Sequence, residues 1–128
     1  MPGSGQVSPA MEDYLEAILD LGGEAQCARV TDIAARMGIA KASVTQALAG
    51  LRASGLVHQE PYGRVHLTAA GREHALRVEK SHRVLRTFLV EVLGVAPGTA
   101  DSEACRLEHS ISQDTLGRLV AFLERYHR

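Results

Sequence analysis

Apolar residues recur at intervals of three and four in three stretches of the first half of the chain, which is the spacing of one buried helix face. In the first stretch, Ser8 and Pro9 are typical of a helix N-terminus, and the apolar stripe over residues 14–21 predicts a helix that is ended by two glycines. Residues 31–38 and 41–54 predict two more helices joined by a tight turn. Two helices connected in this way form a helix-turn-helix.

The next stretch alternates apolar and polar residues instead, which indicates β-strands with one buried face. Residues 56–60 and 64–67 predict two short strands, and Pro61-Tyr62-Gly63 supplies the turn between them. A hairpin that directly follows the third helix is a wing, so the first half of the chain predicts a winged helix-turn-helix.

The helical spacing returns in the second half of the chain. Thr68 is placed to cap a long helix that runs to about residue 93, which is longer than a small winged domain needs. A break at residues 94–98, which contains Gly and Pro, separates it from a short helix at about residues 102–110. Ser112 is then expected to cap a last helix.

With 128 residues, 45% of them hydrophobic, the chain is long enough for one domain or two small lobes with a packed core. We expect a mainly α fold in two parts, a winged helix-turn-helix domain at residues 1–71 and a helical domain at residues 72–128. No apolar run approaches the roughly 20 residues of a membrane span, and the N-terminus lacks the pattern of a signal peptide. A cytoplasmic location is therefore expected.

The two cysteines of the chain are Cys27 and Cys105. Their pairing in a disulfide stays open at this point, although the missing secretion signal favours a reducing compartment. Cys27 is expected in a loop, has no metal-ligand spacing to its neighbours, and is interpreted as a small apolar residue.

Charge is unevenly distributed along a chain whose net charge is −1. Residues 1–28 carry five acids and no Lys or Arg, whereas residues 29–64 carry five bases and two acids. The only clearly basic segment therefore coincides with the predicted helix-turn-helix, which is the distribution expected of a DNA-binding domain.

Small and polar residues fill the first turns of the third predicted helix, which would let it enter a major groove about 12 Å wide. Ser43, Thr45 and Gln46 are candidates to bond base edges or phosphates, and Lys41 is a candidate to bond a phosphate. Arg64 at the wing tip is placed to reach phosphates or a minor groove. An ordinary solvated helix face is the alternative. The predicted DNA-binding residues are Lys41, Ala42, Ser43, Thr45, Gln46 and Arg64.

A second group of residues has the chemistry of a metal site. Cys105, Glu108 and His109 are separated by three and four positions, so a helix would place a thiolate, a carboxylate and an imidazole on one face. Such a set can hold a divalent transition metal ion. Asp13 and Glu16 form a further carboxylate pair, for which favourable placement at a helix N-terminus is the simpler interpretation.

His82 lies in the middle of the long predicted helix and by itself would be interpreted as a surface residue. The two clusters need imidazole partners, which makes a ligand role for His82 more attractive. Metal ligands on either side of a DNA-binding segment suggest a metal-controlled repressor. An enzymatic role, with Cys105 as nucleophile and His109 as base, lacks an oxyanion arrangement or a substrate pocket and is not expected.

Several stretches, taken together and in order, have the character of one protein family. They are MEDYLE (residues 11–16), ARVTDIA (28–34), ASVT (42–45), LTAAG (67–71), His82 and EACRLEH (103–109). The sequence resembles the family of the diphtheria toxin repressor and the manganese transport regulator over nearly its whole length. The resemblance implies a homodimeric transcriptional repressor activated by Mn²⁺ or Fe²⁺, with an N-terminal winged helix and a helical metal-binding and dimerisation domain. It further implies a short form without the SH3-like domain of some members.

The resemblance also implies a ligand set. Asp13 and Glu16 match carboxylate ligands of the manganese branch, whereas Cys105 stands where the manganese branch has Glu and the iron branch has Cys. Arg86 and Asp101 replace two ancillary ligands of the iron branch. The implied ligands are Asp13, Glu16, His82, Cys105, Glu108 and His109, arranged around two ions that share Glu16 and Glu108 as bridges.

The expected ion is Mn²⁺ or Fe²⁺, with Zn²⁺ open, because carboxylates favour hard ions and a thiolate favours softer ones. The alternative is a winged-helix repressor that responds to another ligand or is independent of metal. Double-stranded operator DNA and a second copy of the chain are the expected partners. Neither a membrane nor a small organic substrate is expected.

Overall fold

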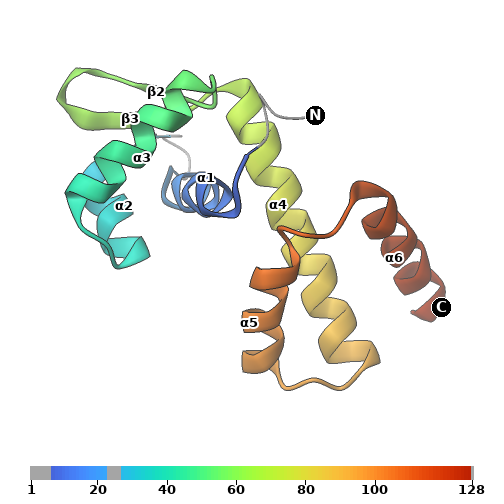
Figure 1. Ribbon diagram of the computed structural model, residues 1–128. Coiled ribbons are helices and arrows are strands. Elements are labelled where there is room, and N and C mark those ends of the chain that lie inside the picture. The colour runs from blue at the N-terminus through green and yellow to red at the C-terminus, as the bar shows by residue number, and fades with distance from the viewer. Residues whose placement is uncertain (1–6, 23–26, 128) are drawn as a thin grey trace. The chain divides into compact units, whose positions relative to one another are not determined.

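The computed structural model describes residues 7–22 and 27–127 (Figure 1). They divide into two compact units, Met1–Leu76 and Arg77–Arg128, and each is described by itself. The boundary expected from the sequence, between residues 71 and 72, stays a prediction. Gly23, one of the two glycines expected to end the first helix, lies outside the described residues.

Three helices form the helical part of the first unit: α1 (Pro9–Gly22), α2 (Val30–Met37) and α3 (Lys41–Ala53). The predicted N-cap of α1 is confirmed, because the Ser8 hydroxyl oxygen accepts a 3.1 Å hydrogen bond from the Met11 amide. Gly38 ends α2 in the left-handed conformation, at φ 68°, which a glycine adopts without steric cost. The tight connection that follows makes α2 and α3 the predicted helix-turn-helix.

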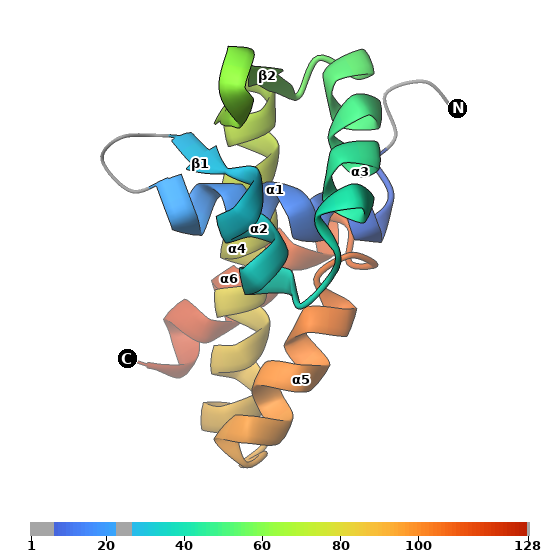
Figure 2. The same cartoon turned by 90° about the vertical axis from the view of Figure 1, so that its left-hand side faces the viewer.

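A three-stranded antiparallel sheet completes the winged helix. Its strands are β1 (Cys27–Arg29), β2 (Val57–Gln59) and β3 (Arg64–Leu67), in the order β1-β3-β2, with a 3-10 turn at Pro61–Gly63. The two wing strands are as predicted, but the expectation of a loop at Cys27 is wrong. Cys27 pairs with His66 in the first position of β1, which Figure 2 shows just before α2. A strand of three residues has too few positions for a repeating pattern.

The core of the first unit joins all of these elements. Thr68 ends the sheet and caps α4 (Ala69–Thr87), since its hydroxyl oxygen accepts from the Gly71 amide at 3.1 Å and donates to the Gly55 carbonyl at 2.7 Å. Gly71 touches the chain at Leu56 so closely that a Cβ would lie 1.9 Å from the Leu56 carbonyl oxygen. The fully buried large side chains are Leu15, Ile18, Ile33, Val44, Leu48, Leu51 and Val65.

The second unit contains the later part of α4, the π-helical turn η3 (Phe88–Val92), α5 (Pro97–Leu107) and α6 (Gln113–Tyr126). Its small core packs Leu85 and Leu89 against Ala100 and Ala104 of α5. The predicted cap of α6 is confirmed, because the Ser112 hydroxyl oxygen accepts from the Thr115 amide at 3.1 Å. None of the described helices is both long enough and apolar enough to cross a membrane.

Two details of the second unit differ from the sequence-based prediction. The long helix does not stay α-helical to residue 93, because its last turn is the wider η3. The short helix starts at Pro97, five residues before its predicted start, and ends at Leu107. Pro97 occupies the first helical turn, where its fixed φ is favourable and its missing N–H costs nothing, so it begins this helix.

Candidate metal centre and nucleic-acid interface

A nitrogen, a sulfur and an oxygen donor meet between α4 and the end of α5. Nδ1 of His82 lies 2.7 Å from Oε1 of Glu108 and 3.8 Å from Sγ of Cys105. One ligand atom from each of these residues lies within 4.8 Å of the others. An imidazole, a thiolate and a carboxylate at this separation are a donor set that divalent transition metal ions accept, so the residues present fit such an ion.

The local structure explains why these side chains meet. Cys105 and Glu108 are three positions apart at the end of α5 and so lie on one side of it. Ala100 and Ala104 are fully buried against the neighbouring helix turns, and their small side chains let α5 approach closely. The Glu108 side chain is only 1% exposed and that of His82 is 24% exposed. A carboxylate so deeply buried needs polar partners, and His82 supplies one.

The expectation that His109 shares a helix face with Cys105 is wrong. Glu108 is the C-cap of α5, and His109 lies in the turn that leads to α6. Residues 108–110 form a turn, and the Ser110 and Ile111 amides both bond to the Leu107 carbonyl. His109 nevertheless stays near the cluster, with its Nε2 3.5 Å from Oε2 of Glu108.

The two other predicted ligands belong to the first unit. Asp13 and Glu16 lie on α1, three positions apart, and offer carboxylate oxygens within 4.8 Å of each other. Asp13 is exposed and Glu16 is half-buried, whereas Tyr14 and Leu15 between them are buried in the core. The winged-helix unit therefore presents a carboxylate pair of its own, as the offset of three predicts.

The five predicted DNA-binding residues of α3 all lie on its exposed side. Lys41, Ala42, Ser43, Thr45 and Gln46 are exposed. Val44 and Leu48, on the other side of the helix, are fully buried. Nothing in the described part of this unit covers the first turns of α3, so they present small and polar side chains outward, as entry into a groove requires.

A second arginine, which the sequence did not single out, lies beside the wing. Arg64 begins β3 and lies directly opposite Arg29 of β1. Both side chains are exposed, and they line a hollow of about 390 Å³ together with Val30, Thr31 and Gly63. Like charges directly opposite each other on a sheet are unfavourable, so an anion between them would be stabilising. Recognising Arg29 required the pairing of β1, the strand that the sequence did not reveal.

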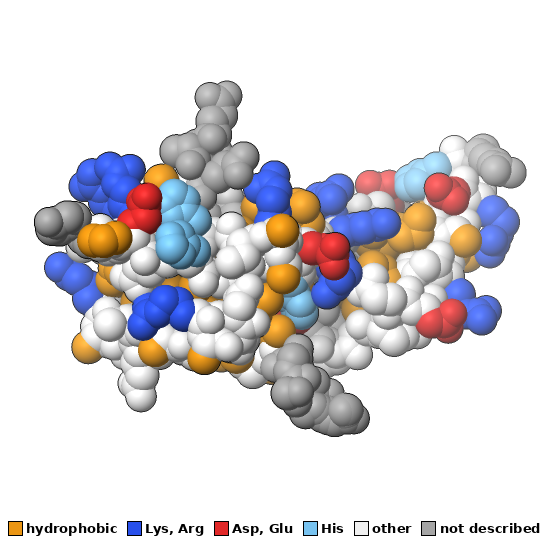
Figure 3. Space-filling model, turned by 90° about the horizontal axis from the view of Figure 1, so that it is seen from above, with side chains coloured by type: hydrophobic (Ala, Val, Ile, Leu, Met, Phe, Trp, Pro, Cys, Tyr) orange, Lys and Arg blue, Asp and Glu red, His pale blue; other side chains and the backbone are white. Residues whose placement is uncertain are grey.

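Histidines and an acid accompany these arginines on the wing. His58 and His66 are cross-strand partners with ring centroids 6.1 Å apart, and Nε2 of His66 lies 3.0 Å from Oε2 of Glu60. The close contact with His66, helped by the charge of Arg64, lowers the pKa of Glu60 from its usual value of 4.5. Figure 3 shows blue and pale blue side chains spread over the winged-helix part of the surface, with little red among them.

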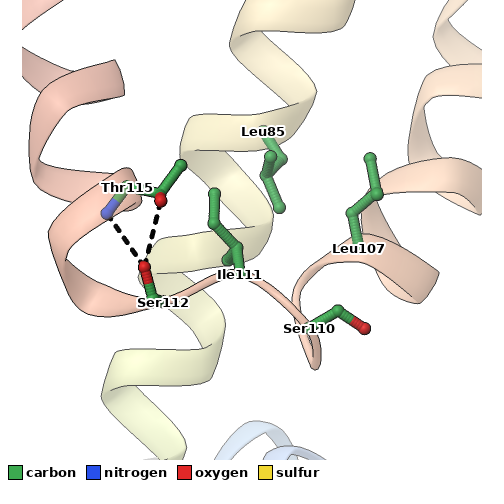
Figure 4. A pocket seen from close by; sticks show the side chains of 6 residues that line it. All are labelled: Leu85, Leu107, Ser110, Ile111, Ser112 and Thr115. Carbon is green, nitrogen blue, oxygen red and sulfur yellow. Dashed lines mark hydrogen bonds between the residues drawn. The ribbon is translucent and has the colours of Figure 1, made fainter.

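An apolar hollow of about 400 Å³ lies in the second unit next to the turn that carries Glu108 and His109 (Figure 4). Leu85 of α4, Leu107 of α5 and Ile111 of the connection to α6 border the same space in that view. Leu107 is 44% exposed. The hollow and this exposed leucine form an apolar surface that the sequence pattern did not predict. The complete lining is Leu85, Leu107, Ser110, Ile111, Ser112 and Thr115.

A winged helix combined with a helical unit that carries metal-binding donors defines the class of metal-responsive DNA-binding regulators. Family models agree with this class. The model described as "Iron dependent repressor, N-terminal DNA binding domain" matches residues 6–65, and that described as "Iron dependent repressor, metal binding and dimerisation domain" matches residues 68–128. The chain belongs to the iron-dependent repressor family.

Individual relatives give the same assignment. The chain is 37% identical over 121 residues to "Uncharacterized HTH-type transcriptional regulator MJ0568" of Methanocaldococcus jannaschii, covering 94% of this chain and 97% of that protein. It is 36% identical over 116 residues to "Transcriptional regulator MntR" of Escherichia coli O157:H7, covering 91% of this chain and 74% of that protein. The family consists of transcriptional regulators, which are not enzymes.

A solved structure shares the fold. The structure of a "Manganese-dependent transcriptional repressor complex with manganese" is 33% identical and superposes with a TM-score of 0.78. The match covers 89% of this chain and 52% of that one, so this chain spans about half the length of that protein. The mainly α fold with an N-terminal winged helix-turn-helix, predicted from the sequence, is confirmed.

Proposed function

We propose that this protein is a metal-activated transcriptional repressor in which a divalent ion controls the binding of operator DNA. The observation that carries the proposal is the meeting of His82, Cys105 and Glu108 in a chain whose other unit is a winged helix. Because operator DNA is the proposed partner, the protein is proposed to act in the cytoplasm.

The proposed metal ligands come from both units. Glu108 and His109 would bind an ion together with Asp13 and Glu16, and His82 and Cys105 would complete the proposed ligand set. Mn²⁺ or Fe²⁺ is the proposed activator, because three of the six ligands are carboxylates, which favour hard ions. Zn²⁺ is the alternative that the Cys105 thiolate supports, since a thiolate strengthens the binding of softer ions.

Coordination of one ion by ligands from both units would let that ion influence DNA binding. Asp13 and Glu16 are on α1, in the same unit as the reading helix α3, whereas the remaining ligands are on the other unit. The carboxylates of Asp13 and Glu16 repel each other when both are charged, and a bound ion would relieve that repulsion. Joint binding by the two ligand groups would restrict the movement of one unit relative to the other, and so the spacing of the reading helices in a dimer.

On the DNA, the exposed first turns of α3 are proposed to enter the major groove. Ser43, Thr45 and Gln46 would contact bases or phosphates there, whereas Lys41 and the opposed pair Arg29 and Arg64 would contact phosphates. In a homodimer, two copies of α3 would read half-sites that lie about one DNA turn, or a multiple of it, apart.

The second unit supplies the proposed dimer surface. Large apolar side chains are exposed here, and the hollow lined by Leu85 and Leu107 lies among the same elements. Exposed apolar surface on a small unit of this kind marks a site of protein association. A second copy of the chain is the occupant that the family description of this region favours. The exposed apolar residues of the unit are Leu93, Leu107, Phe122 and Tyr126.

The test is operator affinity with a chelator and with Mn²⁺, Fe²⁺ or Zn²⁺ supplied in turn, for the parent protein and for His82→Ala. We expect the ion to strengthen binding by a factor of roughly 5 to 150, as coupling energies between sites typically allow, and His82→Ala to remove most of this gain. His127→Ala, at an exposed histidine after α6, is the matched control and should keep it. Equal affinity of the parent under all four conditions would support the metal-independent alternative instead.

A further inference from the structure

The wing has two faces of different chemistry. Val57 and Val65 point into the core and are almost fully buried, so their neighbours along each strand point outward. His58 of β2 lies directly opposite His66 of β3, which places both rings on the outer face. Glu60 has extended backbone and follows His58 by two positions, so its side chain lies on the same face. The outer face of the hairpin therefore carries two imidazoles and a carboxylate.

Two of these three side chains already lie together. Nε2 of His66 is 3.0 Å from Oε2 of Glu60. This nitrogen is buried and has no hydrogen-bond partner within the described part of the chain, so the contact is not aligned as a hydrogen bond. Two ligands of one tetrahedral ion, at bond lengths of about 2.0–2.1 Å, lie about 3.3 Å apart. The nitrogen and the oxygen are therefore spaced like two ligands of a common ion.

His58 supplies a third donor beside them. Its ring centroid is 6.1 Å from that of His66. Residues directly opposite each other on antiparallel strands have Cβ atoms about 4.5–5.5 Å apart, from which two imidazoles can reach the same ion. The His58 side chain is exposed, and exposed side chains change rotamer within nanoseconds. A rotation of His58 brings its ring nitrogen to the ion without any change in the strands.

The nearest arginine of the wing is turned away from these donors. Nη1 of Arg64 lies 3.7 Å from Sγ of Cys27, which belongs to β1. β3 is the central strand, so the guanidinium is directed to one side of it, whereas His58 and Glu60 lie on the side of β2. The carboxylate of Glu60 is the charged group on that side, and it favours a cation there.

We propose that His58, Glu60 and His66 form a zinc site on the wing, with a water molecule as the fourth ligand. Two imidazoles and a carboxylate are a set that Zn²⁺ takes where it keeps an open position, and imidazole suits Zn²⁺ better than the harder Mn²⁺. The site goes beyond the proposed function, because it shares no residue with the proposed regulatory ligands. A bound ion joins β2 to β3 across the turn at Pro61–Gly63 and adds positive charge to the surface proposed to meet DNA phosphates.

The test is a titration of the full chain with Zn²⁺, followed by the ¹H and ¹⁵N NMR signals of the individual histidine rings. It is made in the variant His82→Ala, which removes one of the proposed regulatory ligands. We expect the ring signals of His58 and His66 to shift together, with one dissociation constant. His58→Gln and Glu60→Gln, both at exposed positions, should each weaken the Zn²⁺ binding detected at His66 by at least about 10-fold, because even partners of metal ligands contribute that much.

His127→Gln is the matched control. Nε2 of His127 lies 3.2 Å from Oε1 of Glu91, so the substitution removes a similar contact between a histidine and a glutamate from the second unit. The dissociation constant measured at the wing should stay unchanged in this variant. The zinc site is overturned if Zn²⁺ shifts neither ring of the wing or only one of them. Unchanged Zn²⁺ affinity in His58→Gln and Glu60→Gln overturns it as well.

Discussion

At the residue scale, the choice of ion depends on the donor atoms that a few side chains offer. Glu108 contributes a nearly fully buried carboxylate, His82 a partly buried imidazole, and Cys105 an exposed thiol. The Cys105 side chain is exposed and offers a sulfur donor. Of the candidate ligands it is the softest, and a softer donor shifts affinity away from Mn²⁺.

Cys105→Glu should therefore shift activation toward Mn²⁺ and away from Zn²⁺ or Fe²⁺, with fold and dimerisation intact because residue 105 is exposed. The measurement is operator affinity as each of the three ions is titrated. Cys27→Ser, which changes the other cysteine, is the control and should keep the parent order of ions. If Cys105→Glu keeps the parent order of activating ions, Cys105 is an ordinary helix residue that does not select the ion.

At the element scale, two short segments have specific roles. The wing concentrates positive charge, and the first turn of α4 packs closely on the neighbouring backbone. The opposed Arg29 and Arg64 concentrate positive charge at the wing, on strands of three and four residues. Gly71 fixes the start of α4 against Leu56, at a distance that excludes any side chain. The paired arginines lead to an expectation for DNA affinity. The close backbone contact at Gly71 leads to an expectation for folding.

Arg29→Gln and Arg64→Gln should each weaken binding to all DNA sequences and lower the slope of log affinity against log salt by about 0.9, because each is proposed to contact a phosphate. The measurement is DNA affinity over a range of salt concentrations. Arg36→Gln removes the same charge from α2, where the guanidinium is bonded to Asp20 at 2.6 Å, and should change the slope less. Equal slopes in all three variants would argue against specific phosphate contacts at the wing.

Gly71→Ala should lower the free energy of unfolding by roughly 1–3 kcal/mol or more, because the new methyl group meets the Leu56 carbonyl and forces the backbone to move. Gly50→Ala on α3, where a Cβ meets nothing within 4 Å, should instead raise it by up to about 1 kcal/mol through better helix propensity. Denaturant unfolding of both variants measures the difference. Similar effects in the two variants would mean that the backbone at Gly71 adapts freely.

The elements show how far the sequence alone could be interpreted. The helices α1, α3 and α6 and the strands of the wing followed from apolar periodicity and from capping residues such as Ser8 and Ser112. The strand β1 did not, because three residues carry no periodicity and their conformation comes from pairing with β3. The early start of α5 at Pro97 was missed because Pro and Gly were interpreted as a break, although Pro in the first helical turn favours a start.

At the scale of the whole molecule, the chain combines two units of different chemistry. Sequence offsets singled out Cys105 and Glu108, and the resemblance added His82. The structure brings these three side chains together across 26 positions. Spacing alone could not predict that cluster, because His82 lies on another helix and reaches it only through the packing of α4 on α5. The position of His109 in a turn could not be predicted either, since residues 107–111 contain no Gly or Pro that would mark the end of α5.

The double variant Asp13→Asn, Glu16→Gln tests whether the two units act together through the ion. We expect the double variant still to bind Co²⁺, at lower affinity, and to show the absorption band of a Cys105 thiolate bound to that ion. We expect it to lose most of the metal-dependent gain in operator affinity. The reason is that the ligands remaining in the second unit can still hold an ion but no longer connect it to α1. Absorption and DNA affinity are measured on the same samples.

Asp20→Asn is the control on α1, at a carboxylate paired with Arg36 outside the proposed ligand set, and should behave like the parent. Retention of the full metal-dependent gain by the double variant would contradict a role for α1 in coupling. Loss of the Co²⁺ band as well would show that the α1 carboxylates are needed for binding itself.

The opposed arginines of the wing have a consequence for how dissolved ions act on the protein before it meets DNA. Two guanidinium groups on facing strands repel each other, and mobile anions weaken that repulsion within a Debye length, about 10 Å at 0.1 M salt. Added salt should therefore slow amide hydrogen exchange in β1 and β3 of the unbound protein. The same salt loosens the protein from DNA, because it competes for the phosphates. At high salt the unbound wing is thus most ordered, although it then binds DNA most weakly. At low salt the DNA phosphates supply the negative charge that the strands of the wing lack.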